Sequence, residues 1–316
     1  MNEQTELPEQ TVNPPAQMNP TAVMTAPPAE TSPDTIVAPQ GCAGGCSHGN
    51  ADEGGLESVI PEYIYAVGNV EARFPNLSAE KEFAQAAGRE ITNGKTDQQT
   101  FHAVLSKPEN RYLLRQLCWV FTIQGMETYL LIPRDPADIG LLLDAIRPAK
   151  SPGDDIDVVI GMRGPIAPPE MCNGLMVPVV AFDQIYSFGR SELIGAIPKP
   201  QKTDKARYEA ASEELFDRIM QMADNAGATD EHRNLNYLLM RYTAIYEKAT
   251  EQFGQGCSLT GVEVRPSPRN GIRNMVDTIF SYTNRSTDFT EKFFVRVDVT
   301  EEFPFLVSKM SPYYDR

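Results

Sequence analysis

The sequence predicts an α+β fold, in which a largely antiparallel sheet is interrupted by a long αα-hairpin and preceded by a disordered N-terminal tail. Short runs rich in β-branched and aromatic residues lie before residue 190 and again after residue 257, which is typical of strands. Between them, apolar residues recur with the helical period. The first 56 residues contain no aromatic residue and eight of the 25 prolines, so they are expected to lack a core.

The N-terminal segment, residues 1–56, is also acidic. It holds seven acidic residues and no Lys or Arg, in a chain whose net charge is −15. We therefore expect a disordered acidic tail followed by one domain over residues 57–316. The chain shows no Lys/Arg cluster of the kind that nucleic-acid binding requires. No apolar run has the length of a membrane span, and the N-terminus does not resemble a signal peptide, so a cytoplasmic location is expected.

The first ordered elements should be a strand and two helices. The run YIYAV, which begins at Tyr63, is rich in residues that favour strands. A helix is predicted over residues 78–88, because Ser78 can cap its start and Gly88 can end it. The segment TDQQTFHAVLS, residues 96–106, predicts a second helix that begins at a capping threonine or aspartate.

A β-hairpin and a short helix should follow. CWVFTI and ETYLLIP are typical of strands, and the glycine of the intervening QGM supplies the positive φ of a tight turn. In DPADIGLLLDAIRP, Asp135 caps a helix with one apolar face. We interpret Cys118 as a small buried hydrophobe, because five cysteines, an odd number, do not indicate a disulfide framework in a chain of this size.

The segment GMRGPIAPPEMCNGLMVP joins two further strands and is a candidate site. Its prolines restrict φ, so we expect a stiff loop that presents Arg163, Glu170 and Asn173 to a partner at a sheet edge. Pro178 indicates a bulge or an edge position in the second of these strands. The catalytic candidates are Glu170 as a general base and Cys172 as a nucleophile, although no histidine lies nearby in sequence to activate a thiolate.

The rest of the chain should form the helical hairpin and a second group of strands. Two long helices are expected on either side of the short NAGATD turn, the second running to Gly254. His232 lies at this tip, in a polar cluster that either binds a partner or only caps the helix. In the last hairpin, Val295, Val297 and Val299 should face one side of the sheet.

The C-terminal segment VTEEFPFLVSKMSPYYDR is rich in aromatic residues. Tyr313 and Tyr314 are candidates for a surface that contacts a peptide or another subunit, since interfaces favour tyrosine. Phe305 and Leu306 are expected to pack in the core.

Cys42, Cys46 and His48, in CAGGCSHG, form the one candidate metal site. Thiolate and imidazole are ligands that zinc prefers, although a structural zinc site needs a fourth ligand. The alternative is a glycine-rich linker with two exposed thiols.

Several long segments in the same order resemble the C-terminal domain of PatA/PatG-type cyanobactin maturation proteases. They include YIYAVGNVEARFPNLSAEKEFAQAAGR, NRYLLRQLCWVFTIQGMETYLLIPRDPAD and FVRVDVTEEFPFLVSKMSPYYDR, and the resemblance covers Tyr63 to Arg316. In that family the domain follows a subtilisin-like protease and is a domain of unknown function. The resemblance implies a place in the biosynthesis of ribosomally made, post-translationally modified peptides. The sequence contains no subtilisin-type serine motif, so the protease activity is not carried over.

Three functional hypotheses follow. The first is an accessory, non-catalytic domain that recognises a precursor peptide or a partner enzyme and forms a homo-oligomer. The second is a peptide-modifying enzyme that depends on zinc or on the Cys/Glu pair. The third is a scaffold that is tethered through its flexible tail.

Overall fold

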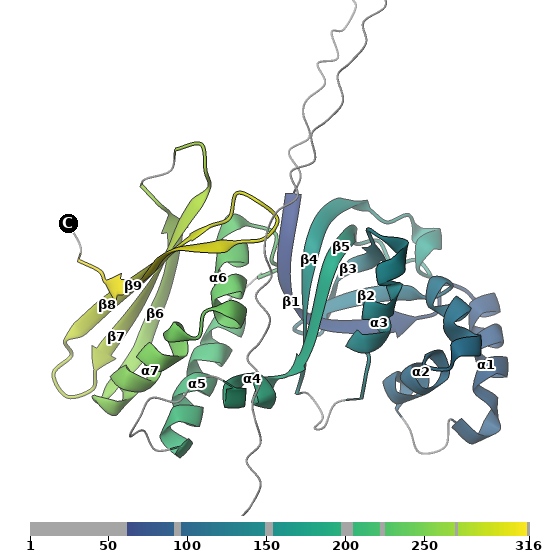
Figure 1. The fold of residues 1–316 in the computed structure, drawn as a ribbon, viewed down its shortest axis with the longest axis horizontal. Coiled ribbons are helices and arrows are strands. Elements are labelled where there is room, and N and C mark those ends of the chain that lie inside the picture. The colour runs from purple at the N-terminus through teal and green to yellow at the C-terminus, as the bar shows by residue number, and fades with distance from the viewer. Residues whose placement is uncertain are drawn as a thin grey trace, which may run out of the picture. The chain divides into compact units, whose positions relative to one another are not determined.

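The computed structural model describes residues 62–91, 96–148, 154–196, 205–221, 225–268 and 271–314. All of them belong to one compact unit, Ser58–Arg316. The α+β class is confirmed, and the strands form two sheets: a closed five-stranded barrel and a separate four-stranded sheet (Figure 1).

The barrel contains β1 (Glu62–Arg73), β2 (Cys118–Ile123), β3 (Met126–Pro133), β4 (Asp155–Ile166) and β5 (Pro178–Gly189), in the order β1-β2-β3-β5-β4. Neighbouring strands are antiparallel except for the parallel pair β3 and β5. The predicted hairpin β2–β3 is confirmed, with positive φ at both Gln124 and Gly125, as a type I′ turn requires. Pro178 is the first residue of its strand, where its missing N–H does not interrupt the ladder.

Two glycines allow the barrel strands to approach closely. A Cβ added at Gly68 would lie 2.2 Å from the carbonyl oxygen of Thr122, and one at Gly161 would lie 2.3 Å from that of Ala181. Alternate residues of the strands fill the interior, among them Ile64, Phe121 and Phe182. The barrel is therefore a packed core and contains no channel at these positions.

Helices α1 (Leu77–Ile91), α2 (Asp97–Leu105), α3 (Ile139–Ala145) and the 3₁₀ segment η1 (Pro108–Arg115) pack their apolar faces into the barrel core. The 3₁₀ segment η2 (Pro136–Asp138), which precedes α3, has no buried residue. The first helix begins earlier than predicted, because Asn76 accepts a hydrogen bond from the N–H of Ala79 and so takes the capping role expected of Ser78. Gly88 interrupts α1 with a φ of 64°. The capping box at Thr96 confirms the predicted start of α2.

The second sheet is antiparallel and contains β6 (Cys257–Pro266), β7 (Met275–Asn284), β8 (Thr290–Asp298) and β9 (Phe305–Pro312) in sequence order. Helices α4 (Arg190–Ala196), α5 (Lys205–Met220), α6 (Asp230–Arg241) and α7 (Ala244–Gly254) share one core with this sheet and with the outer face of β1 and β4 (Figure 1). The helical hairpin therefore connects the two sheets.

The second long helix of the predicted hairpin is two helices. Tyr242 separates α6 from α7 with φ −114° and ψ 87°, outside the helical region. Its hydroxyl oxygen accepts a hydrogen bond from the N–H of Met310 on β9 at 2.9 Å, so a tertiary contact overrides the local helical pattern.

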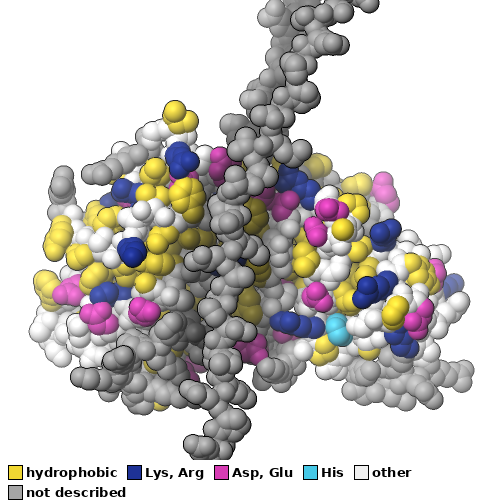
Figure 2. Space-filling view, in the orientation of Figure 1, with side chains coloured by type: hydrophobic (Ala, Val, Ile, Leu, Met, Phe, Trp, Pro, Cys, Tyr) yellow, Lys and Arg dark blue, Asp and Glu magenta, His cyan; other side chains and the backbone are white. Residues whose placement is uncertain are grey.

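The apolar pattern of the last strands is confirmed in part. Val295, Val297 and Val299 are fully buried against the helices, as predicted. The prediction for Phe305 is wrong, because its side chain is 42% exposed: β9 is an edge strand, and Phe305 faces away from the helices while Leu306 faces them. Figure 2 shows apolar side chains, with Lys and Arg between them, over the part of the molecule where Figure 1 places this sheet.

The loop between α5 and α6 is fastened to the barrel. The N–H of Tyr65 donates to the carbonyl of Gly227 at 2.9 Å, and the hydroxyl of Tyr129 donates to the carbonyl of Ala226 at 2.8 Å. The side-chain amide of Asn236 donates to the carbonyl of Tyr65 at 2.7 Å. The tip of the helical hairpin is thus hydrogen-bonded to strands β1 and β3 of the barrel.

Candidate functional site

The segment between β4 and β5 lies on the outside of the barrel and is mostly exposed, and of its described residues only Ala167 and Cys172 are buried. Its predicted place at a sheet edge is wrong, because β4 pairs with both β1 and β5 and the barrel is closed. The segment folds over the outer face of β2, β3 and β5, where Ala167 and Cys172 pack against Val120 and Leu130.

Cys118 and Cys172 form a disulfide, which corrects two predictions. Their Cα atoms are 5.7 Å apart although 54 residues separate them in the sequence. Both residues are nearly fully buried, at 7% and 3% exposed. The predicted burial of Cys118 is confirmed, but the expectation that it forms no disulfide is wrong. The interpretation of Cys172 as a nucleophile is also wrong, because its sulfur is already bonded. The closure of the barrel brings the two cysteines together, and their spacing in the sequence does not predict this pairing.

The other three candidates of this segment, Arg163, Glu170 and Asn173, each have different surroundings. Arg163 pairs with Glu62 on β1 at 2.7 Å. Glu170 is exposed in the short 3₁₀ turn Pro169–Met171. Asn173 takes a left-handed φ of 46° and lines a surface hollow together with Cys172.

The remaining predicted residues lie outside that hollow. The backbone N–H of His232 donates to the hydroxyl of Thr229, the residue that caps α6. The ring of Tyr313 lies beneath the guanidinium of Arg265 and edge to face with Phe294 on the second sheet, and Tyr314 is 79% exposed. The predicted zinc ligands Cys42, Cys46 and His48 lie outside the described residues.

A groove at the end of β1 is the candidate site. One hollow of about 950 Å³ lies between β1, α1 and α2, and a second of about 670 Å³ lies between β1, α1 and the 172–175 loop. Both are lined by Arg73, Phe74 and Glu80, so we treat them as one feature, the β1 groove. The larger hollow is in the size range of small-ligand sites.

An aromatic cluster forms the apolar side of the β1 groove. The ring centroids of Phe74, Phe83 and Phe101 lie 4.7 to 5.3 Å apart. Ala84 and Ala87 continue this wall along α1, and their small side chains leave the space open. The wall suits a large apolar side chain of a ligand.

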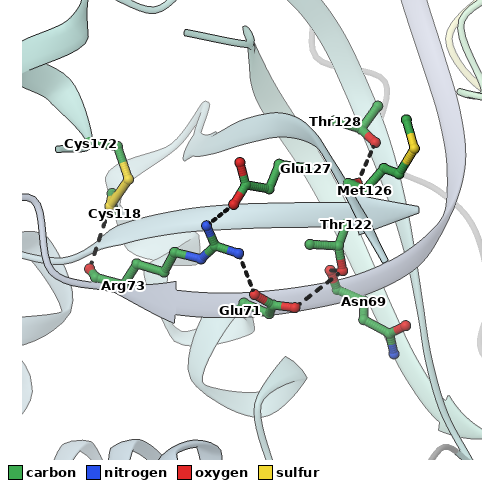
Figure 3. Close-up of polar contacts among 9 residues, drawn as sticks. All are labelled: Asn69, Glu71, Arg73, Cys118, Thr122, Met126, Glu127, Thr128 and Cys172. Carbon is green, nitrogen blue, oxygen red and sulfur yellow. Dashed lines mark hydrogen bonds and ion pairs between the residues drawn. A yellow bond between two sulfur atoms is a disulfide. The ribbon is translucent and has the colours of Figure 1, made fainter. Parts of the chain in front are cut away.

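Arg73 forms the polar centre of the β1 groove. Figure 3 shows its guanidinium between Glu71 on the same strand and Glu127 on β3, with an N–O distance of 2.8 Å to Glu71. Partial burial alone would lower the pKa of Arg73, but the hydrogen bonds to Glu127 and Glu71 outweigh it and raise that pKa above its ordinary value. Arg73 is therefore a permanent cation held between two carboxylates.

The disulfide lies at the smaller hollow of the β1 groove, which Cys172 lines. A sulfur of Cys118 lies 3.5 Å from the carbonyl oxygen of Arg73, on the paired strand (Figure 3). A disulfide sulfur carries no proton, so this is a packing contact. The disulfide thus holds the 172–175 loop beside Arg73.

A second polar cluster, outside the groove, joins the barrel to the second sheet. Arg134 contacts Asp183 on β5 at 2.8 Å and Glu302 before β9 at 3.4 Å. Burial, followed by the hydrogen bond and like charge of Asp183, raises the pKa of Glu302 to about 7. These residues connect two elements and line neither hollow of the groove.

In the described ranges, no group of three His, Cys, Asp or Glu side chains is placed to hold a metal ion. No described helix is long and apolar enough to cross a bilayer. The sequence reasoning missed Arg73 and the aromatic wall, although the run EARF, followed by a helix with Phe83, Ala84 and Ala87 on one face, carried a signal.

Comparisons with known proteins agree with the resemblance seen in the sequence. A solved structure described as "PatG Domain of Unknown Function" shares the fold, with a TM-score of 0.65 and 18% identity over 79% of this chain and 98% of that one. No curated protein matches the sequence. The family model of the PatG domain matches residues 63–265, which is more than half of the sequence, so this chain belongs to the PatG domain family.

Proposed function

We propose that this protein is an accessory, non-catalytic domain in the biosynthesis of ribosomally made, post-translationally modified peptides of the cyanobactin type, and that it binds the linear precursor peptide in the β1 groove. Membership of the PatG domain family supports the pathway. Cys172 is bonded to Cys118 in a disulfide, which removes the nucleophile of the Cys/Glu form of the enzyme hypothesis.

The continuity of the β1 groove is the observation that carries this proposal. Two hollows meet at Arg73, Phe74 and Glu80, so an extended ligand can occupy both. One hollow has an aromatic wall, and the other is lined by the polar residues Asn76 and Asn173. An extended peptide has apolar side chains for the first and a polar backbone for the second.

The test is a titration of the full chain with linear precursor, cyclic product and the pathway enzymes. An Ala84→Trp variant fills the larger hollow from an exposed helical position, so it should weaken precursor binding about tenfold or more. Gln85→Trp, the neighbouring exposed position outside the groove, is the matched control and should bind as the wild type does.

Equal binding by the Ala84→Trp variant would place the peptide elsewhere. Binding of a pathway enzyme without the precursor would replace the peptide with a protein partner. The zinc site at Cys42, Cys46 and His48 and the homo-oligomer stay predictions; elemental analysis and light scattering of the full chain test them.

A further inference from the structure

The charges of the described residues that line the β1 groove are unbalanced. They comprise four carboxylates and one cation: Glu71, Glu80, Asp97, Glu127 and Arg73. Arg73 is already shared between Glu71 and Glu127. Within the described residues, Glu80 and Asp97 have no ion-pair partner, and both side chains are exposed.

The two unpaired carboxylates lie beside the apolar wall. Glu80 is three and four positions before Phe83 and Ala84 on α1, so the three share one helix face. Asp97 is four positions before Phe101 on α2. Both carboxylates and both aromatic residues line the same hollow. When the apolar side chain of a ligand enters this hollow, the ligand group next to that side chain therefore lies near the carboxylate of Glu80 or Asp97.

Arg73, the cation among the described residues of the lining, is not available to a ligand anion. A ligand carboxylate would have to displace Glu71 or Glu127 from Arg73, and it would still meet the charges of Glu80 and Asp97. Repulsion between like charges opposes the binding of such an anion. A ligand cation instead gains Glu80 and Asp97 as partners without breaking an existing ion pair.

Building on the proposed function, we propose that the β1 groove selects peptide segments in which a large apolar side chain stands next to a positively charged amine. The apolar side chain lies against Phe83, Phe101 and Ala84, and the amine lies between Glu80 and Asp97. A lysine side chain and a free N-terminal amine share this chemistry.

The test uses six-residue synthetic peptides and the full chain. Three blocked peptides carry Phe-Lys, Phe-Gln or Phe-Glu at the centre, a fourth replaces Phe by Gly beside Lys, and a fifth is Phe-Gln at an unblocked N-terminus. Affinities are measured by fluorescence anisotropy at low and at physiological salt. We expect Phe-Lys to bind about fivefold tighter than Phe-Gln at low salt, with Phe-Glu weakest, because exposed ion pairs contribute modestly and are screened by salt.

The double variant Glu80→Gln, Asp97→Asn should abolish the preference for Lys over Gln and keep the preference for Phe over Gly. Glu109→Gln with Glu213→Gln removes two exposed charges outside the groove and should keep both preferences. A gain for the unblocked peptide over blocked Phe-Gln identifies the N-terminal amine as one source of the charge.

Equal affinities for the Lys, Gln and Glu peptides, or tighter binding of Phe-Glu, would overturn the inference. It would also fall if none of these peptides bound while the precursor bound in a manner sensitive to Ala84→Trp, and the proposed function would then stand. Failure of the precursor itself to bind is the separate result that removes the proposed function.

Discussion

At the residue scale, Asp157 on β4 is a carboxyl enclosed by the barrel wall. It is 2% exposed and accepts hydrogen bonds from the N–H of Val70 at 2.7 Å and the hydroxyl of Ser187 at 2.5 Å. Burial outweighs these hydrogen bonds and raises its pKa to about 7. The folded state therefore holds a proton that the unfolded state releases at lower pH.

Asp157 should make the protein less stable as pH rises. Because the folded pKa lies above the unfolded one, the folded state binds more protons between about pH 4 and pH 7, and the free energy of unfolding falls across this window. In Asp157→Asn, the amide oxygen can accept from the N–H of Val70 and the amide N–H can donate to the hydroxyl of Ser187, so a neutral group fills the same site. Relative to this variant, wild type should lose about 2 kcal/mol between about pH 5.5 and about pH 8, measured by urea unfolding. A parallel pH dependence of the two proteins would contradict this.

The residues of the β1 groove show the limit of sequence reasoning at this scale. Cys172 and Asn173 were singled out because they stand in an unusual segment, and both line the groove. Arg73 was not, because the run EARF indicates an arginine beside an aromatic residue but not its ion pair: its partner Glu127 lies 54 positions away and is brought close by the pairing of β1, β2 and β3.

At the element scale, the helices and strands that local signals define were predicted well. Thr96 caps α2 and the QGM turn closes the β2–β3 hairpin, because capping and turn chemistry act within a few residues. The break at Tyr242 and the closure of the barrel were not predicted, because both depend on contacts between distant segments.

The loop between α5 and α6 gives a prediction at this scale. Gly227 has a φ of 72°, and a Cβ there would lie 2.5 Å from the carbonyl oxygen of Tyr65. Gly125 has a similar φ of 77° and open space around it. Gly227→Ala should therefore cost at least about 2 kcal/mol more of unfolding free energy than Gly125→Ala, which carries the backbone strain alone. Equal losses in denaturant unfolding would show that the loop can move away from β1.

At the scale of the whole molecule, Arg233 joins the barrel, the helices and the second sheet. It lies on α6, 5.5 Å from the ring of Tyr63 on β1, and donates to the carbonyls of Val299 at 2.7 Å and of Glu301 and Glu302 before β9. Burial lowers the pKa of Arg233, and the charge of Asp230 opposes this. The sequence indicated His232 as the candidate at the tip of the helical hairpin. Arg233, the next residue, makes the contacts with β1 and with the segment before β9.

Arg233→Met should uncouple the two sheets. The three carbonyls lose their donor, so we expect a loss of about 3 kcal/mol in unfolding free energy. The second sheet should also unfold before the barrel, which splits the thermal transition in calorimetry. Arg233→Lys, which retains a donor, should restore part of the stability. A single transition at the wild-type temperature would contradict this role.

The disulfide between Cys118 and Cys172 determines how the protein must be prepared. Cytosolic expression and thiol-containing buffers keep cysteines reduced, and in that form nothing covalent holds the 172–175 loop beside Arg73. Samples made with and without reductant therefore present different grooves, and a peptide that binds only the oxidised sample would be missed by a purification that includes a thiol throughout.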